Sequence, residues 1–239
     1  MGTIKVKGIV IKESNMGDFD KMITLLTPNG RIECSAKGAR RPKSQLMSAT
    51  QFLCFGEYMI FKSSSHTYTL NSCETIELFY NIRIDLDKLE YAANITKIIQ
   101  DVTYENQSTY KILQLYLNTL YVISNTTMEL DFITSIFKLR LISLLGLTPN
   151  ISECVECGEK NIEKLTSFSI LDNGVKCKTC SKQDTGAIGI NITILKAIYY
   201  IIKAPAKKIY SFNMSEENKK TLQLIAKIYT NEKLEKEYK

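Results

Sequence analysis

Residues 22–37 have the sequence MITLLTPNGRIECSAK, and this stretch decides how the first part of the chain folds. Its first five residues form a short apolar run, and the TPNG segment that follows has the composition of a tight turn. After the turn, apolar residues at positions 32, 34 and 36 alternate with polar or charged residues, which is the period of a half-buried strand. The stretch therefore predicts a β-hairpin with one charged face.

More strands are predicted on both sides of this hairpin. Near the amino terminus, Ile4 and Val6 alternate with lysines, and we expect a bulge at Gly8 in this first strand. Two further strands, over residues 52–62 and 68–78, flank a turn that contains His66, the single histidine. Five short strands in about 80 residues favour a small closed barrel of the OB type, although an SH3-like barrel fits the number of strands nearly as well.

The hydrophobic period changes from that of strands to that of helices after residue 80. Apolar residues then recur at steps of three and four, as on the buried face of a helix. The predicted helices cover residues 86–102, 110–123, 130–145 and 192–202, and a last one begins after Ser215. Gly146 and Pro149 are expected to end the third helix. The charged residues 231–239 are expected to be frayed.

Four of the seven cysteines form two Cys-x-x-Cys pairs, with 19 residues between the pairs. These residues are Cys154, Cys157, Cys177 and Cys180. The spacing is typical of a zinc site, because each pair can present two thiolates to one edge of a tetrahedron. Four cysteine ligands close the coordination shell, so we expect one structural Zn²⁺. Two disulfides or a dithiol redox pair are the alternatives; the lack of a secretory signal disfavours the first, and the doubled motif disfavours the second.

Together these patterns predict an α+β protein with two domains. Residues 1–80 are expected to form an OB-fold β-barrel that binds nucleic acid. Residues 81–239 are expected to form an all-α domain into which the zinc module, residues 151–187, is inserted. The other cysteines, Cys34, Cys54 and Cys73, lie in apolar runs and are predicted to be small buried residues.

The composition argues against several classes of protein. The chain has 31 Lys and Arg against 25 Asp and Glu, and no run approaches the ~20 apolar residues of a membrane-spanning helix. A single histidine rules out most triads and histidine-rich metal sites, and neither a P-loop nor a dinucleotide-binding glycine motif occurs. We therefore expect a cytoplasmic protein without membrane contact that is not an enzyme.

Positive charge is concentrated in one loop near the amino terminus. Residues 1–50 hold nine Lys and Arg against four Asp and Glu, and no acidic residue lies between Glu33 and Glu57. Four cations fall within seven positions of this interval: Lys37, Arg40, Arg41 and Lys43. Glycine and proline among them indicate a loop. Such a loop suits a polyanion, because each cation that neutralises a phosphate releases condensed counterions; the alternative is an ordinary solvated run of charges.

Several motifs resemble the RecO family of bacterial recombination-repair proteins. The first group comprises Gly17-x-x-Asp20-Lys21, Leu25-x-Thr27, Gly30-Arg31 and the basic stretch AKGARRPKS at residues 36–44. The second is FKLRLISLLGLTP at residues 137–149, which leads into Cys154-x-x-Cys157-Gly158. The likeness extends over essentially the whole chain. It implies an OB-fold followed by a helical domain that carries a zinc module.

The resemblance also implies a mediator of DNA repair and homologous recombination. Such proteins bind single- and double-stranded DNA, anneal complementary strands, and work with RecR to load RecA onto DNA coated by single-strand-binding protein, in association with the nucleoid. The phosphate contacts expected here are Lys37, Arg40, Arg41 and Lys43, with Arg31 and Lys21 as secondary contacts. Phe19 and Tyr58 are candidates for base stacking, although aromatic residues of a small barrel more often lie in its core. Arg140 is the candidate contact for the acidic tail of single-strand-binding protein, with helix capping or a surface role as alternatives.

Three functions from other classes remain as alternatives. An RNA-binding zinc-ribbon protein would share the basic loop and the metal. A protein-interaction scaffold would keep the helical core but bind no nucleic acid. A nuclease would need clustered carboxylates, and the close pairs at residues 18 and 20 and at residues 85 and 87 resemble solvated turn or helix-start acids.

Overall fold

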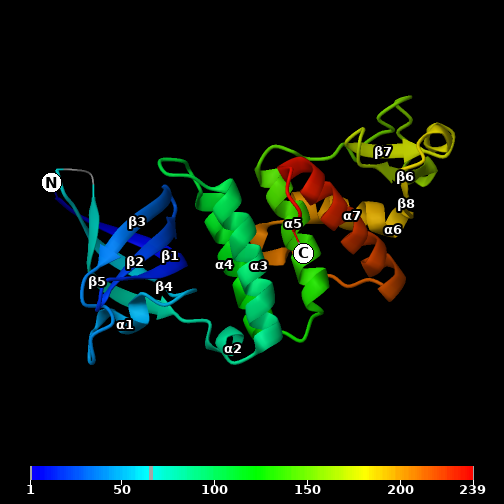
Figure 1. The fold of residues 1–239 in the computed structure, drawn as a ribbon. Helices are drawn as coiled ribbons and strands as arrows, with labels where there is room; N and C mark the ends of the chain where they lie inside the picture. Colours follow the sequence, from blue (N-terminus) through cyan, green and yellow to red (C-terminus); the bar gives the residue numbers. More distant parts are fainter. Residues whose placement is uncertain (1, 65–66, 239) are drawn as a thin grey trace. The chain divides into compact units, whose positions relative to one another are not determined.

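The computed structural model describes residues 2–64 and 67–238. The chain folds as two compact units, Met1–Ser124 and Asn125–Lys239 (Figure 1). The domain boundary predicted between residues 80 and 81 coincides with the change from strands to helices. The first compact unit continues past this point and includes helical residues up to Ser124. The predicted domain boundary therefore stays a prediction. His66, which the sequence places in a turn, lies outside the described residues.

The first unit begins with a closed five-stranded barrel in the order β1-β2-β3-β5-β4 (Figure 1). Its strands are β1 (Gly2–Met16), β2 (Asp20–Thr27), β3 (Gly30–Ala36), β4 (Phe55–Lys62) and β5 (Tyr68–Glu77). Neighbouring strands are antiparallel except for the short parallel pairing of β3 with β5, and a short helix, α1 (Leu46–Ala49), lies between β3 and β4. The structure therefore confirms a barrel of the OB type.

A continuous apolar core fills the barrel, because inward-facing residues alternate with outward-facing ones along each strand. The core residues include Val10, Ile23, Leu25, Cys34, Cys54, Tyr58, Ile60 and Leu70, each at most 3% exposed. Two of the three cysteines predicted to be buried are therefore in the core, whereas Cys73 is only half-buried.

The bulge predicted at Gly8 is wrong. Gly8 pairs with Gly56 of β4 without interruption, and the register of β1 against β2 shifts instead between Val10 and Lys12. A Cβ atom at Gly8 would lie 3.0 Å from the carbonyl oxygen of Leu26. Close approach of two backbones therefore explains the glycine, and the sequence signal for such an approach is the same as that for a bulge.

Three helices follow the barrel: α2 (Tyr80–Arg83), α3 (Leu86–Val102) and α4 (Tyr110–Asn125), whose last residue is the first of the second unit. The loop between α3 and α4 holds the β2–β3 turn, since the Arg31 N–H donates to the Tyr104 carbonyl at 3.1 Å and the Thr109 N–H donates to the Pro28 carbonyl at 2.9 Å. Gly30 has a φ of 107°, and a Cβ atom there would lie 2.6 Å from the Tyr104 carbonyl oxygen. The turn predicted from the sequence is thus also where the barrel meets its helices.

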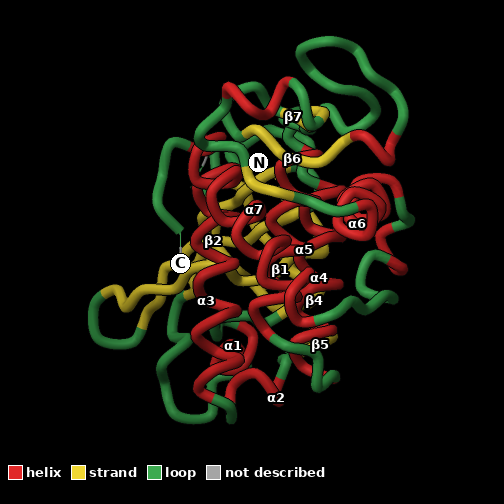
Figure 2. The backbone as a smooth tube through the Cα atoms, turned by 90° about the vertical axis from the view of Figure 1, so that its right-hand side faces the viewer, coloured by secondary structure: helices red, strands yellow, loops and turns green. Residues whose placement is uncertain are grey.

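The second unit consists of three long helices and a small three-stranded sheet with the order β7-β6-β8. Figure 2 distinguishes the helices (red) from the strands (yellow). The helices are α5 (Leu130–Leu144), α6 (Ile192–Lys203) and α7 (Glu216–Leu234), and the strands are β6 (Leu165–Ser169), β7 (Gly174–Cys177) and β8 (Ile188–Gly189). Short 3₁₀ turns are η1 (Ile162–Lys164), η2 (Cys180–Gln183) and η3 (Ala206–Lys208).

The end of α5 and the end of the chain test two predictions made from the sequence. Gly146, with a φ of 84°, follows the last residues of α5, and the Leu147 N–H donates to the Ile142 carbonyl at 3.0 Å, which confirms the predicted glycine stop. The predicted fraying from residue 231 onwards is wrong for residues 231–238. Helix α7 continues to Leu234, and Tyr238 is buried while its N–H donates to Asn231 Oδ1 at 3.0 Å. Burial of Tyr238 and this hydrogen bond therefore hold the charged segment against the protein.

Among the described residues, none of the helices combines the length and the apolar character that crossing a bilayer requires.

Candidate nucleic-acid interface and metal centre

The basic loop, residues 37–44, connects β3 to α1 as a series of tight turns. The Arg41 N–H donates to the Gly38 carbonyl at 3.1 Å, and the Ser44 N–H donates to the Arg41 carbonyl at 3.0 Å. Gly38 and Lys43 adopt left-handed backbone conformations, with φ of 65° and 66°. Ala39 is fully buried and anchors the loop on the barrel core. Backbone turns and the buried Ala39 therefore contribute to the shape of the loop.

All four predicted phosphate contacts of the basic loop are exposed: Lys37, Arg40, Arg41 and Lys43. Among residues 2–64 and 67–238, no carboxylate forms an ion pair with any of them. Four cations that lack carboxylate partners leave the charge of the loop uncompensated. This arrangement gives the site the electrostatic character that phosphate binding requires.

The two secondary contacts predicted from the sequence are engaged within the protein. Lys21 forms an ion pair with Glu13 of the neighbouring strand. The Arg31 side chain donates from Nη1 to the Gln100 carbonyl at 3.0 Å, and its guanidinium carbon lies 5.7 Å from the centre of the Tyr104 ring. Both side chains thus support the fold of the first unit, and their contact with DNA stays a prediction.

The turn between β1 and β2 is joined to the basic loop by three hydrogen bonds. The Arg40 N–H donates to the Phe19 carbonyl at 2.8 Å, and Arg40 Nη1 donates to the Gly17 carbonyl at 3.3 Å. In the third hydrogen bond, the Gly38 N–H of the loop donates to Asp20 Oδ1 at 2.7 Å. The motif around residues 17–21 and the basic loop, which lie about 20 residues apart in the sequence, therefore form one surface.

The structure separates the two aromatic candidates. Tyr58 is fully buried, and its hydroxyl donates to the carbonyls of Ala49 and Cys54, each at 3.0 Å, so it is a core residue. Phe19 is 47% exposed beside the basic loop.

A pocket of about 380 Å³ opens at the other end of the strands, near the β2–β3 turn. Val6, Ile32 and Lys62 are among the residues that line it, and Lys62 Nζ lies 5.4 Å from the centre of the Tyr68 ring. No pattern in the sequence predicts this pocket. Lys5 of the first strand lines the pocket and is paired with Glu57. The pairing of Lys62 with Tyr68 depends on the β4–β5 register, which the sequence alone does not fix.

The four predicted metal ligands lie together in the second unit, with their sulfur atoms all within 4.8 Å of one another. The Cys157 and Cys177 sulfurs are 3.8 Å apart. Zn–S bonds of about 2.3 Å in a tetrahedron place neighbouring sulfurs about 3.8 Å apart, so the cluster has the right size for one such ion. The geometry fits a closed four-thiolate site, compatible with a structural zinc ion.

Backbone hydrogen bonds prepare this site for a cation. The Gly158 N–H donates to the Cys154 carbonyl at 2.9 Å in a tight turn, and the Cys177 N–H points to Cys154 Sγ at 3.4 Å. Burial alone would raise the pKa of Cys154, but N–H groups of Cys157 and Cys177 lower it to about 6. A thiol that ionises readily is a good metal ligand, because the thiolate is the form that binds.

An ion-pair cluster supports the strand that leads into the second cysteine pair. Lys176 is buried, with Nζ 2.7 Å from Asp172 and 3.4 Å from both Asp184 and Glu156. The Ser169 hydroxyl bridges Asp172 and Asp184 at 2.9 and 2.6 Å. The hydrogen bond that Lys176 donates to the Asp172 carboxylate raises the pKa of Lys176 above its usual range. The cluster therefore holds the β6–β7 hairpin together through charge.

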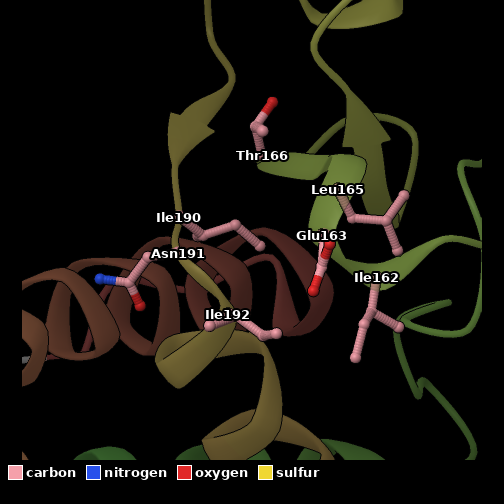
Figure 3. Close-up of a pocket in the computed structure, with 7 residues that line it drawn as sticks. All are labelled: Ile162, Glu163, Leu165, Thr166, Ile190, Asn191 and Ile192. Carbon is pink, nitrogen blue, oxygen red and sulfur yellow. The ribbon is translucent and has the colours of Figure 1, made fainter.

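A second pocket, of about 370 Å³, lies between the start of β6 and the start of α6. Figure 3 shows Ile162 and Leu165 on one side, Ile190 and Ile192 on the other, and Glu163 between them. Its lining is mostly apolar and contains one carboxylate and no cation. This pocket does not suit a phosphate backbone.

Arg140, the candidate partner contact, lies half-buried on α5. Its Nη1 donates to the carbonyl of Ile201 at 3.1 Å and also to that of Ile202. These carbonyls belong to the last turn of α6, where helix carbonyls lack partners within the helix. The contacts are those of a helix cap, one of the alternatives that the sequence left open. Binding of a partner's tail by Arg140 stays a prediction.

Comparison with known families covers almost the whole chain. Residues 1–79 match the family model described as "Recombination protein O N terminal", and residues 83–239 match "Recombination protein O C terminal". The chain belongs to the RecO family. This membership confirms the resemblance noted in the sequence and supports a role in DNA repair.

Individual relatives of this RecO-family chain match it over nearly their full lengths. The DNA repair protein RecO of Acetivibrio thermocellus is 42% identical over 239 residues, which cover 100% of this chain and 94% of the relative. The proteins of the same name from Alkaliphilus metalliredigens and Thermoanaerobacter sp. are each 32% identical, over 95% and 100% of this chain and 92% and 96% of the relatives. The likeness therefore includes both the barrel and the four-cysteine part.

Proposed function

We propose that this RecO-family chain is a recombination mediator that binds single- and double-stranded DNA through the basic loop and anneals complementary strands. It would act with RecR to load RecA onto DNA coated by single-strand-binding protein, in association with the nucleoid. The observation that carries the proposal is the basic loop itself. It presents four exposed cations that form no ion pair with any carboxylate of the described residues, on a backbone that Ala39 and the neighbouring turn hold in place.

Annealing needs cations that reduce phosphate repulsion between two strands while the base edges stay open for pairing. Side chains on one loop can contact the backbone of a strand without enclosing its bases. This requirement matches an exposed loop better than a deep cleft. The proposal requires no bond to be made or broken, so we infer that the chain is not an enzyme.

Two further parts of the proposal concern the second unit. We infer that the ion in the four-thiolate site is Zn²⁺ with a structural role, because all four ligands are cysteines and the shell is closed. We also propose that the helical part binds the acidic tail of single-strand-binding protein, with Arg140 as its carboxylate contact. Because Arg140 caps α6, its replacement should also loosen the end of that helix, and tail binding has to be measured together with the stability of α6.

The salt dependence of DNA binding tests the role of the basic loop. The variant carries Lys37→Gln, Arg40→Gln, Arg41→Gln and Lys43→Gln. A control with the same change in net charge carries Lys203→Gln, Lys207→Gln, Lys208→Gln and Lys220→Gln, which are also exposed. We expect the loop variant to bind a labelled oligonucleotide more weakly and to flatten the slope of log K against log salt by up to ~0.7 for each lost single-strand contact. If loop and control variants share the wild-type slope, the loop is not the DNA site.

Strand annealing distinguishes the proposal from its alternatives. The measurement is the rate at which complementary strands pair, with and without bound single-strand-binding protein. We expect acceleration by the wild type and its loss in the loop variant, whereas a protein scaffold would not accelerate pairing. Competition between DNA and RNA oligonucleotides of matched sequence tests the RNA-binding alternative, which predicts preference for RNA.

A further inference from the structure

The turn between β1 and β2 presents an aromatic ring beside the basic loop that the phosphate contacts do not explain. Phe19 is 47% exposed, and neighbouring Gly17 has a φ of 56°, which turns the chain sharply at this point. An exposed phenylalanine leaves apolar surface in water, and covering that surface with a bound ligand is favourable in free energy. What distinguishes Phe19 is its position next to the exposed cations of the basic loop.

The position of this ring is restrained on the backbone and on one face. The Phe19 carbonyl accepts the Arg40 N–H at 2.8 Å, and the flanking Asp20 carboxylate accepts the Gly38 N–H at 2.7 Å. The guanidinium carbon of Arg41 lies 5.5 Å from the centre of the Phe19 ring, within cation–π range. A restrained turn loses less conformational freedom when a ligand binds than a mobile one would.

An aromatic ring beside arginines is the usual composition of a platform for single-stranded nucleic acid, because every base offers a π-face and every nucleotide a phosphate. In a duplex, both faces of an internal base are covered by its neighbours in the stack. An unpaired base can place a face on Phe19 without breaking such a stack. The ring therefore adds something that the cations alone do not provide, namely discrimination between unpaired and paired DNA.

We propose that Phe19, with Arg41 against its ring, stacks one unpaired base and so directs the basic loop toward single-stranded DNA. This inference rests on the proposed function, since it assumes that the loop binds DNA. Phosphate contacts supply most of the affinity, and the stacked base supplies the preference for unpaired strands.

The test compares two probes of equal length and charge, an oligo-dT strand and a strand of abasic sites, which keeps the phosphates but lacks the bases. The variants are Phe19→Leu, which keeps an apolar side chain without a ring, and Phe19→Trp, which restores a ring. We expect Phe19→Leu to weaken oligo-dT binding by about 5- to 150-fold, the range for loss of one stacked base. Abasic binding and the salt slope should not change, and Phe19→Trp should restore oligo-dT binding.

Two results would overturn the stacking role: equal binding of oligo-dT by Phe19→Leu and the wild type, or an equal loss on both probes. Neither affects the proposed function if the loop variant with four glutamines still loses DNA binding. Conversely, wild-type protein that binds neither probe would contradict the proposed function itself. The two proposals therefore fail in distinguishable ways.

Discussion

In the barrel, buried apolar side chains come from all five strands, whereas in the module of residues 151–187 the main point of convergence is a group of four thiolates. The module has a small apolar core of its own, including Leu165, Phe168 and Val175, and it adds the Lys176 ion-pair cluster. Phe168 also packs edge-to-face on Tyr229 of α7, with ring centres 5.5 Å apart. The barrel core does not depend on the four cations of the basic loop, whereas the module uses the Lys176 ion-pair cluster to hold itself together.

Metal removal should show the largest difference between the two regions. A zinc chelator, or the double substitution Cys154→Ser with Cys177→Ser, should unfold the module, because ~10 to 16 kcal/mol of apparent binding free energy is typical of small structural zinc sites. Amide hydrogen exchange should accelerate in residues 154–180 and stay unchanged in the barrel strands. Cys73→Ser, a half-buried cysteine outside the cluster, serves as control and should keep about one zinc per chain. Metal-free wild-type protein with two disulfides would contradict the zinc assignment.

A cavity in the barrel core should destabilise the barrel and leave the zinc module unchanged. Leu25 is fully buried, so Leu25→Ala should destabilise the barrel by about 2 to 5 kcal/mol through lost packing. Hydrogen exchange of the barrel amides measures the loss, and the zinc content should stay the same. Ile76→Ala, at a residue that is 51% exposed on β5, should have little effect. Loss of zinc in Leu25→Ala would show that the two regions are not independent.

A backbone contact inside the module should have a smaller effect. A Cβ atom at Gly174 would lie 2.4 Å from the Asn150 carbonyl oxygen and 2.5 Å from Val155, so Gly174→Ala must displace the hairpin at a cost of about 1 to 3 kcal/mol. Zinc affinity, measured by competition with a chelator, should fall. Gly189→Ala is the matched control, because nothing lies within 4 Å of a Cβ atom there. Equal zinc affinity in the two variants would disprove the steric argument.

Neutralising the basic loop should change stability least. Exposed side chains without ion-pair partners contribute little to folding, so the variant with four glutamines should keep the barrel's stability within about 0.5 kcal/mol for each substitution. Thermal unfolding of the loop variant and the wild type measures this. A larger loss would mean that these cations serve the fold, and a drop in DNA affinity would then lose its simple electrostatic meaning.

Much of this architecture could be predicted because it depends on local patterns. The hairpin at residues 22–37, the Gly146 helix stop and the cysteine spacing each express rules that act over a few residues. The failures involve distant contacts. Gly8 is explained by the backbone of another strand, and Tyr238 is held by burial that no local pattern reveals.

In the candidate site, too, local features could be predicted from the sequence and contacts between distant segments could not. The basic loop was visible in the sequence, because charge and glycine content are local properties. Its union with the 17–21 turn was not, since it depends on how β1, β2 and β3 align. For the same reason, the sequence could not tell that Tyr58 is in the core and Phe19 at the surface, nor that Arg31 is occupied by Gln100.

The contact between the β2–β3 turn and the loop that joins α3 to α4 has a practical consequence for protein engineering. The Gly30 N–H donates to the Thr109 hydroxyl oxygen at 3.0 Å, and the carbonyl of Tyr104 leaves no room for a side chain at Gly30. A hairpin tip is ordinarily the first choice for inserting a peptide tag or a fluorophore, but here an insertion would separate the barrel from its helices. Labels for single-molecule work belong instead near Gly186, where a Cβ atom would meet only the side chain of Asp184 at 3.7 Å.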